Sequence, residues 1–203
     1  MKNILIGLIL ICGFANGYSQ NKELPKYYAD PMIIDSSWIM IPIYYKPHIA
    51  LKQEELWEGH YANILFYNCK TDSIKMLFKG DTYIKPLPYE WVPNYSIHNK
   101  QYSNKWIFYF VKVSDYNNNG RLDTNDPYTL YVSGKNGNEL RPLTQPNENA
   151  MSIDIFDKQG FALIKIQSDT NGNKKFGNRE WADFYYIRLD LNSLKLARKI
   201  DIK

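Results

Sequence analysis

The sequence has few cysteines and histidines. Cysteines form the disulfides that stabilise many small exported proteins, and both residue types are common zinc ligands. It contains two cysteines and three histidines in 203 residues. Cys12 lies in an N-terminal segment that we expect to be removed, so Cys69 would remain alone and no intrachain disulfide could form. Cys69 ends an apolar run, which predicts a buried, unreactive thiol. His48, His60 and His98 lack the spacing of zinc ligands, and surface positions are expected for them.

Motifs of several common enzyme classes are also missing. The sequence has no glycine-rich phosphate loop and no G-x-S-x-G motif. Glu54, Glu55, Glu58 and Glu90 could serve glycoside hydrolysis, but nothing in the sequence brings any two of them together. The 25 basic and 21 acidic residues are too balanced to favour nucleic acid or an anionic membrane as a partner. We therefore expect a protein without catalytic activity.

A long hydrophobic run occurs only at the N-terminus. Lys2 precedes an apolar stretch at residues 4–11, and small residues follow it at Gly13, Ala15, Gly17 and Ser19. This pattern predicts a secretory signal cleaved after Ser19, and the stretch is too short to span a membrane. A lipid anchor on Cys12 is disfavoured because the preceding Ile11 is too large. We expect residues 20–203 to be a single domain in the periplasm, at the cell surface or in the medium, without a transmembrane segment.

Strand-forming residues dominate the rest of the chain. Tyr, Ile, Phe, Trp and Val cluster in short runs separated by Asn, Gly, Asp and Pro, which is typical of an all-β protein. No stretch keeps a helical period, and residues 51–57 form a short helical turn at most. Strands are predicted at residues 38–45, 62–67, 73–78, 82–87, 106–114, 128–133, 139–144, 152–156, 161–168, 183–188 and 194–200.

These strands fall into three similar units, at about residues 30–79, 80–145 and 150–203. In the second and third units, an aromatic strand enters a polar loop, another strand leaves it, and a tight turn leads to a closing strand. The first unit has the strands without the polar loop. A single four-stranded meander cannot bury both of its faces, so such units must stack on one another.

One closing segment carries a family resemblance. Residues 130–132 read Leu-Tyr-Val and residues 137–144 read Gly-Asn-Glu-Leu-Arg-Pro-Leu-Thr. This resembles the blade ending of TolB-like β-propellers, and it covers the second unit well, the third partly and the first by strand pattern alone. The resemblance implies a propeller-like repeat, although the "SPDG" turn of that family is missing. Three units are too few for an ordinary closed ring, so a partial propeller, a curved three-sheet array and a β-sandwich remain alternatives.

Two polar loops of twelve residues lie 54 residues apart. Loop one is residues 115–126 and loop two is residues 169–180. Both have side-chain oxygens at positions 1, 3, 5 and 12 and an apolar residue at position 8, as in EF-hand calcium loops, which also use the position 7 carbonyl and a water at position 9. The pattern also resembles dockerin-type loops. The predicted calcium ligands are Asp115, Asn117, Asn119, Arg121, Asp123 and Asp126 in loop one, and Asp169, Asn171, Asn173, Lys175 and Glu180 in loop two.

The two loops differ at position 6 and in charge. Loop one has Gly120 there, whereas loop two has Lys174, for which a left-handed backbone costs roughly 1 kcal/mol. Loop one also offers three carboxylates, while loop two offers two. We therefore expect tighter binding in loop one, with both sites in the weak extracellular range of about 10⁻⁴ to 10⁻³ M. Because strands flank both loops, the ions would brace hairpins rather than switch helices.

Aromatic residues in two predicted long loops suggest a ligand-binding face. They are Trp57, Tyr61, Tyr89, Trp91 and Tyr95. Such residues bind sugars or peptides, although they could equally cover the open ends of the sheets. The sequence thus predicts an exported binding or scaffold protein with structural calcium and a protein or glycan partner. A carbohydrate-active enzyme or accessory module, and a structural component of an envelope complex, are the alternatives.

Overall fold

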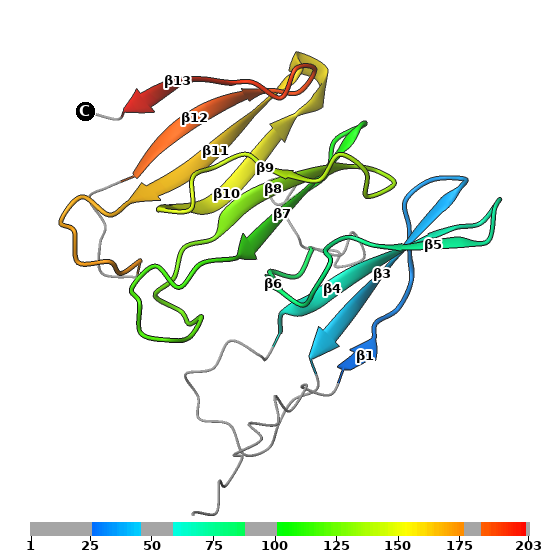
Figure 1. The fold of residues 1–203 in the computed structure, drawn as a ribbon. Coiled ribbons are helices and arrows are strands. Elements are labelled where there is room, and N and C mark those ends of the chain that lie inside the picture. The colour runs from blue at the N-terminus through cyan, green and yellow to red at the C-terminus, as the bar shows by residue number, and fades with distance from the viewer. Residues whose placement is uncertain (1–25, 46–58, 88–100, 177–183, 202–203) are drawn as a thin grey trace, which may run out of the picture.

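The fold is known from a computed structural model, which describes residues 26–45, 59–87, 101–176 and 184–201 (Figure 1). Within these ranges the regular elements are strands, apart from one 3₁₀ turn at Asp157–Gln159, and all strand neighbours are antiparallel. The all-β class predicted from the sequence is therefore confirmed. The described part of the chain has no helix that is long and apolar enough to cross a membrane.

The described strands form two open sheets. The first sheet has the order β1-β3-β4-β6-β7-β8-β9, with β2 paired to β3 and β5 paired to β4. Its strands are β1 (Lys26–Tyr28), β2 (Met32–Ile33), β3 (Trp38–Tyr45), β4 (Tyr61–Asn68), β5 (Ser73–Met76), β6 (Tyr83–Ile84), β7 (Trp106–Lys112), β8 (Thr129–Gly134) and β9 (Arg141–Pro142). The second sheet runs in chain order through β10 (Glu148–Phe156), β11 (Phe161–Ser168), β12 (Phe184–Asp190) and β13 (Leu196–Asp201).

The two sheets form three layers (Figure 1). Strands β3 and β4 of the first sheet make the first layer, β7 and β8 of the same sheet make the middle layer, and the second sheet makes the third layer. Successive side chains of a strand point to opposite faces. Tyr109 and its alternate neighbours on β7 therefore pack against β3 and β4, while Phe108 and Phe110 pack against the second sheet. Two cores result, one on each side of β7. The first two units are joined into one sheet, because β6 pairs with β4 through Tyr61 and Ile84 as well as with β7.

The layers are held by apolar side chains that are almost completely buried. The core between the first and middle layers contains Met40, Tyr61, Ile64, Phe66, Leu77, Ile84, Ile107, Tyr109 and Val111. The core between the middle layer and the second sheet contains Phe108, Phe110, Leu130, Val132, Ile153, Ile164, Ile166, Tyr185 and Leu189. Each such side chain contributes about 1.5–3 kcal/mol to folding.

A glycine allows the first and middle layers to approach closely. Gly137 lies in the turn between β8 and β9 with φ of +71°, and a Cβ atom at this position would stand 2.7 Å from the ring of Phe66. Both the left-handed backbone and the lack of space exclude a larger residue here. The polar turn predicted in the second unit is therefore also a packing contact with the first unit.

Some predicted features are corrected by the structure. Cys69 is exposed rather than buried, because β4 ends at Asn68 and Cys69 begins the turn to β5. The strands predicted at residues 73–78, 82–87 and 139–144 are shorter than expected, as β5, β6 and β9. The helical turn predicted at residues 51–57 lies outside the described residues.

Replacing Phe108 with Ala tests the dependence of the fold on the middle layer. The side chain is fully buried, so its loss should lower the free energy of unfolding by about 3–5 kcal/mol in urea denaturation. Ile74→Ala is the control, because Ile74 is 70% exposed and its loss should change stability by less than about 1 kcal/mol. Equal effects of the two substitutions would contradict the layered core.

Candidate metal centre

The two polar loops lie at the same end of the layers, although they come from different sheets (Figure 1). Loop one connects β7 to β8, and loop two connects β11 to β12. All of loop one is described, as is loop two as far as Phe176. Glu180, the predicted closing ligand of loop two, lies outside the described residues.

The backbones of the two loops share their unusual conformations. Position 4 is left-handed in both loops, at Asn118 with φ of 58° and at Gly172 with φ of 70°. Position 6 is left-handed as well, at Gly120 with φ of 85° and at Lys174 with φ of 58°. The strained conformation predicted for Lys174 is therefore confirmed, and residues outside glycine and asparagine rarely adopt it.

Three backbone-to-side-chain hydrogen bonds recur at the same positions in both loops. The position 6 amide donates to the position 1 carboxylate, the position 5 amide to the position 3 side chain, and the position 7 amide to the position 5 side chain. In loop one these are Gly120 N to Asp115 Oδ2 (2.7 Å), Asn119 N to Asn117 Oδ1 (3.0 Å) and Arg121 N to Asn119 Oδ1 (3.1 Å). In loop two they are Lys174 N to Asp169 Oδ2 (2.9 Å), Asn173 N to Asn171 Oδ1 (2.9 Å) and Lys175 N to Asn173 Oδ1 (2.8 Å).

The closing residue of loop one is already engaged by the protein. Asp126 is 1% exposed, and its carboxylate accepts hydrogen bonds from Tyr116 N at 2.9 Å and Asp123 N at 2.8 Å. It therefore ties the two ends of the loop together. Within the described residues, no group of three or more His, Cys, Asp or Glu side chains comes together as a metal site. Oδ1 and Oδ2 each accept one of these hydrogen bonds and each keeps a further lone pair, so binding an ion would not require either bond to break.

Asp123 is buried next to the same closing residue. Its Oδ1 accepts from Asn125 N at 2.8 Å, and its Oδ2 accepts from Asn119 Nδ2 at 2.8 Å. Burial raises the pKa of Asp123, but these hydrogen bonds outweigh burial and hold the pKa below its usual range. The carboxylate is therefore ionised at neutral pH and adds negative charge to loop one.

Lys112, the last residue of β7, places a buried cation behind loop one. Its side chain is among the buried ones, and Nζ donates to the backbone carbonyls of Asp123 (2.9 Å) and Asp126. Nζ also lies 4.5 Å from the centre of the Tyr128 ring. Burial lowers the pKa of Lys112 to about 8, although Asp126 and Asp123 oppose this, so the amine remains mostly charged at neutral pH.

The sequence contained a signal for this residue that its interpretation missed. Lys112 lies two residues after Phe110 and four after Phe108, in a strand of otherwise apolar residues. The three side chains therefore share one buried face of the strand, and Lys112 comes directly before the loop. A buried ammonium group requires hydrogen-bond acceptors, and the nearest ones are the carbonyls of the loop that follows.

The two loops also contact each other. Tyr116 Oη donates to Asp169 Oδ2 at 3.2 Å, and Phe176 N donates to Asn125 O at 3.2 Å. The rings of Tyr116 and Phe176 lie 5.5 Å apart. Phe176, at position 8 of loop two, is buried, so the predicted apolar position serves as the packing contact between the loops. Leu122, at the same position in loop one, lines a hollow instead.

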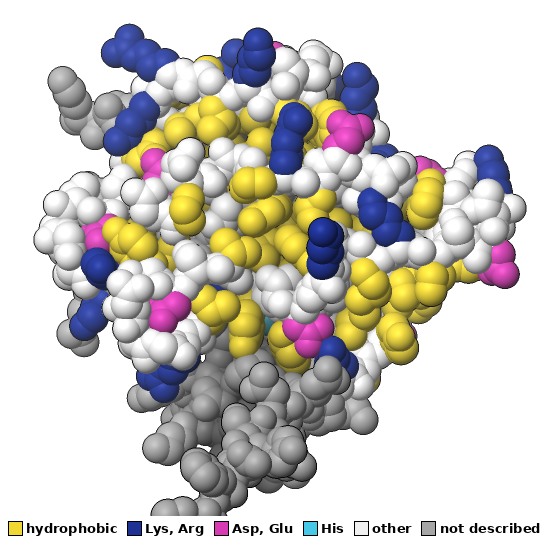
Figure 2. All heavy atoms as spheres, viewed as in Figure 1, with side chains coloured by type: hydrophobic (Ala, Val, Ile, Leu, Met, Phe, Trp, Pro, Cys, Tyr) yellow, Lys and Arg dark blue, Asp and Glu magenta, His cyan; other side chains and the backbone are white. Residues whose placement is uncertain are grey.

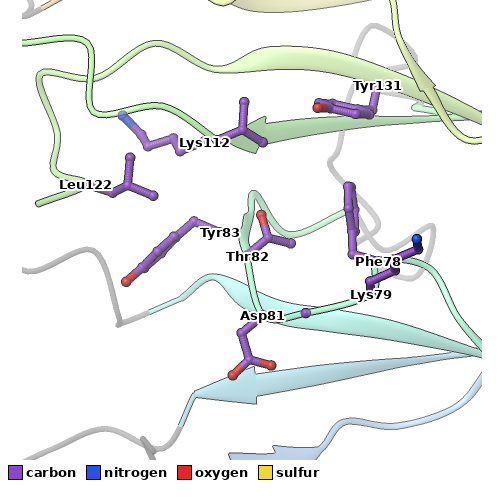
Figure 3. A pocket seen from close by; sticks show the side chains of 10 residues that line it. Phe78, Lys79, Asp81, Thr82, Tyr83, Lys112, Leu122 and Tyr131 are labelled. Carbon is purple, nitrogen blue, oxygen red and sulfur yellow. The ribbon is translucent and has the colours of Figure 1, made fainter. Parts of the chain in front are cut away.

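This hollow separates loop one from the first layer. It has a volume of about 300 Å³ and lies between residues 78–83 on one side and Lys112, Leu122 and Tyr131 on the other (Figure 3). Asp81 is the only carboxylate among its described lining residues, and it pairs with Lys26 at 2.7 Å. The described lining therefore offers one carboxylate, whereas glycoside hydrolysis uses two.

The predicted aromatic face receives one correction. Tyr61 begins β4, is fully buried, and its hydroxyl accepts a hydrogen bond from Leu87 N at 3.2 Å. Its prediction as a loop residue that contacts a ligand is therefore wrong, because the strand starts one residue earlier than expected and its ring fills the core. The rest of the predicted face, and the candidate acids, lie outside the described residues, namely Trp57, Tyr89, Trp91, Tyr95, Glu54, Glu55, Glu58 and Glu90.

Of the three histidines, His60 lies within the described residues. His60 is partly buried, and its Nε2 lies 2.7 Å from Tyr128 Oη, where the two rings also stack. This contact joins the end of the first layer to the strand that follows loop one. His48 and His98 lie outside the described residues.

Lys112→Met should destabilise the protein, because it removes the ammonium group and leaves buried carbonyls of loop one without a donor. We expect a loss of about 2–4 kcal/mol in the free energy of unfolding, measured by urea denaturation at pH 7. Lys165→Met is the control, because Lys165 lies over the Phe184 ring on the second sheet and holds no loop. A loss below 0.5 kcal/mol for Lys112→Met (roughly the effect of a surface substitution) would contradict this role.

No protein-family model matches the chain, and no curated protein matches its sequence. The TolB-like resemblance thus stays a prediction that rests on residues 130–144 and on the order of the strands. The functional interpretation of the loops follows from their geometry and chemistry.

Proposed function

We propose that this is an exported, non-catalytic binding or scaffold protein whose paired loops hold structural calcium ions. The observation that carries this proposal is the shared geometry of the two loops. They are 54 residues apart, yet they repeat the same left-handed positions and the same three hydrogen bonds. Ordinary hairpin loops also use Asn, Asp and Gly. They are not expected, however, to place oxygen-bearing side chains at the same positions of two twelve-residue loops.

The side chains in the first half of each loop suit calcium chemically. Calcium prefers six to eight oxygen ligands, which carboxylates, amide side chains, backbone carbonyls and water supply. In loop one, Asp115, Asn117 and Asn119 would contribute side-chain oxygens and Arg121 its carbonyl. Asp126 would close the site through one oxygen, and Asp123 would act through water. The ion would supply the positive charge that balances these carboxylates.

Loop two contains an oxygen that fits the same role. Asp169 Oδ1 is buried and has no hydrogen-bond partner among the described residues, whereas Oδ2 accepts two hydrogen bonds. An unpaired buried carboxylate oxygen costs free energy, and a bound cation would remove this cost. Asn171, Asn173 and the Lys175 carbonyl would complete the first half of the site, with Glu180 as the predicted closing ligand.

The position of the loops supports a structural role for calcium. Loop one leaves the middle layer and loop two leaves the second sheet, so ions in both would brace the end at which these layers meet. With a dissociation constant of about 10⁻⁴ to 10⁻³ M, each site would stabilise the fold by about 0.6–1.8 kcal/mol at roughly 2 mM calcium. This is a useful contribution for a domain whose total stability is on the order of 5–15 kcal/mol.

The features around the loops favour binding over catalysis. Among the described residues that line the hollow beside loop one, Asp81 is the only carboxylate. On the face shown in Figure 2, basic and acidic side chains are interspersed and do not form a patch of one sign. Such a surface suits a protein or glycan partner better than nucleic acid.

Two experiments would separate the alternative functions. A glycan array tests for glycan binding, which a carbohydrate-active enzyme or accessory module would also show. A pulldown from envelope extract tests for a structural role in an envelope complex.

Calcium should raise the melting temperature. In calorimetry of the protein without its first 19 residues, we expect 2 mM CaCl₂ to raise Tm by about 1–7 °C per occupied site relative to EGTA. Asp115→Asn keeps a hydrogen-bond acceptor but removes charge, so it should reduce this rise. Asp190→Asn is the matched control, because Asp190 accepts similar turn hydrogen bonds from Asn192 and Ser193 outside the loops. If isothermal titration shows no heat at millimolar calcium, the metal proposal fails.

Export should remove the first 19 residues. When the full chain is expressed in a bacterial host, mass spectrometry of the exported protein should place its N-terminus at Gln20. Gly17→Arg puts a large residue three positions before the cleavage point and should block processing. An exported wild-type protein that still begins at Met1 would contradict the signal.

A further inference from the structure

Tyr116 connects the ligand positions of both loops. It follows Asp115, the first position of loop one, and its N–H donates to Asp126, the closing position of the same loop, at 2.9 Å. Its side chain crosses to loop two, where Oη donates to Asp169 Oδ2 at 3.2 Å. One residue therefore touches the closing position of loop one and the first position of loop two.

Asp169 is oriented by the donors on one of its oxygens. Tyr116 Oη and Lys174 N both donate to Oδ2, at 3.2 and 2.9 Å. Oδ1 is buried and has no hydrogen-bond partner among the described residues. Two donors on one carboxylate oxygen hold the group in one rotamer and leave the other oxygen for a cation. Tyr116 is thus a positioning residue for loop two, supplied by loop one.

A second contact joins the loops through their backbones. Phe176 N donates to Asn125 O at 3.2 Å, and Asn125 immediately precedes the closing residue Asp126. The Phe176 ring lies against the Tyr116 ring, with centroids 5.5 Å apart and planes at 41°. Because Phe176 is 6% exposed, it cannot move without disturbing both neighbours. A shift of Asp126 toward an ion in loop one would therefore move two groups that contact loop two.

We propose that Tyr116 couples the two loops, so that calcium in loop one raises the calcium affinity of loop two. This inference rests on the proposed calcium binding. The physical reason is that the first ion bound orders Tyr116, Asn125 and Phe176, and the second ion then binds a loop whose first ligand is already oriented. Coupling of this kind is reciprocal, so an ion in loop two must favour loop one by the same factor.

A double-mutant cycle tests the coupling, with calcium as the probe and titration calorimetry as the readout. The affinity of loop two is measured in the protein without its first 19 residues, with and without Asp115→Asn, which impairs loop one. This change should weaken loop two by about fivefold or more when Tyr116 is present. In proteins that also carry Tyr116→Phe, which removes only the hydroxyl, the same change should alter loop two by less than twofold.

Tyr67→Phe provides the matched control. It removes a similar hydrogen bond, from Tyr67 Oη to Asp72 Oδ1 at 2.8 Å, at a hairpin far from the loops. The fivefold effect of Asp115→Asn should persist in that background. Circular dichroism of each variant establishes that the fold is intact, and Asp169→Asn identifies which binding event belongs to loop two.

Each outcome of the experiment has a distinct meaning. Equal weakening of loop two in the Tyr116 and Phe backgrounds, or no weakening in either, overturns the coupling while calcium binding stands. An absence of any calcium heat in the wild-type protein overturns the proposed function and the coupling together. Amide exchange gives a calcium-free check, since a Phe176 N–H that exchanges as fast as an open loop would show that the contact between the loops does not form.

Discussion

The burial of β7 on both faces is the constraint on which the rest of this structure depends. Tyr109 and its alternate neighbours face the first layer, while Phe108 and Phe110 face the second sheet. A strand of this kind cannot be stable in a single sheet exposed to water, so layers must cover it from both sides. The three-layer order and the position of loop one at the end of β7 follow from this requirement.

Lys112 links the apolar strand β7 to the polar loop that follows it. Lys112 takes the last buried position of β7, where an apolar side chain would leave the loop carbonyls without donors. Its charge also offsets the carboxylates of Asp123 and Asp126, which the loop gathers in a small volume. Lys112 thus anchors loop one to β7, and the first half of the loop, for which we propose calcium binding, lies nearer the surface.

The paired loops show how stacked strands can bring together two loops that are distant in the chain. Each loop lies between corresponding strands of consecutive units, and stacking of the layers brings the two loops into contact. Tyr116 and Phe176 then meet across the boundary between the units. The first unit has no such loop, so the fold does not depend on calcium to define its repeat. The apolar cores between the layers hold the fold together, and the contacts between the two loops add to this at one end.

Much of this structure was determined by the sequence alone. Alternating apolar runs located β3, β4, β7 and β11 almost to the residue, and the spacing of Asp, Asn and Gly located both loops, because these patterns reflect local backbone and side-chain chemistry. The tertiary structure decided that Tyr61 is buried, that Cys69 is exposed, that Lys112 holds loop one and that Tyr116 reaches Asp169. The contacts of Tyr61 and Tyr116 join residues distant in the chain, and such contacts arise only when the layers pack together. The exposure of Cys69 and the role of Lys112 depend on where β4 ends and on how loop one folds back over β7.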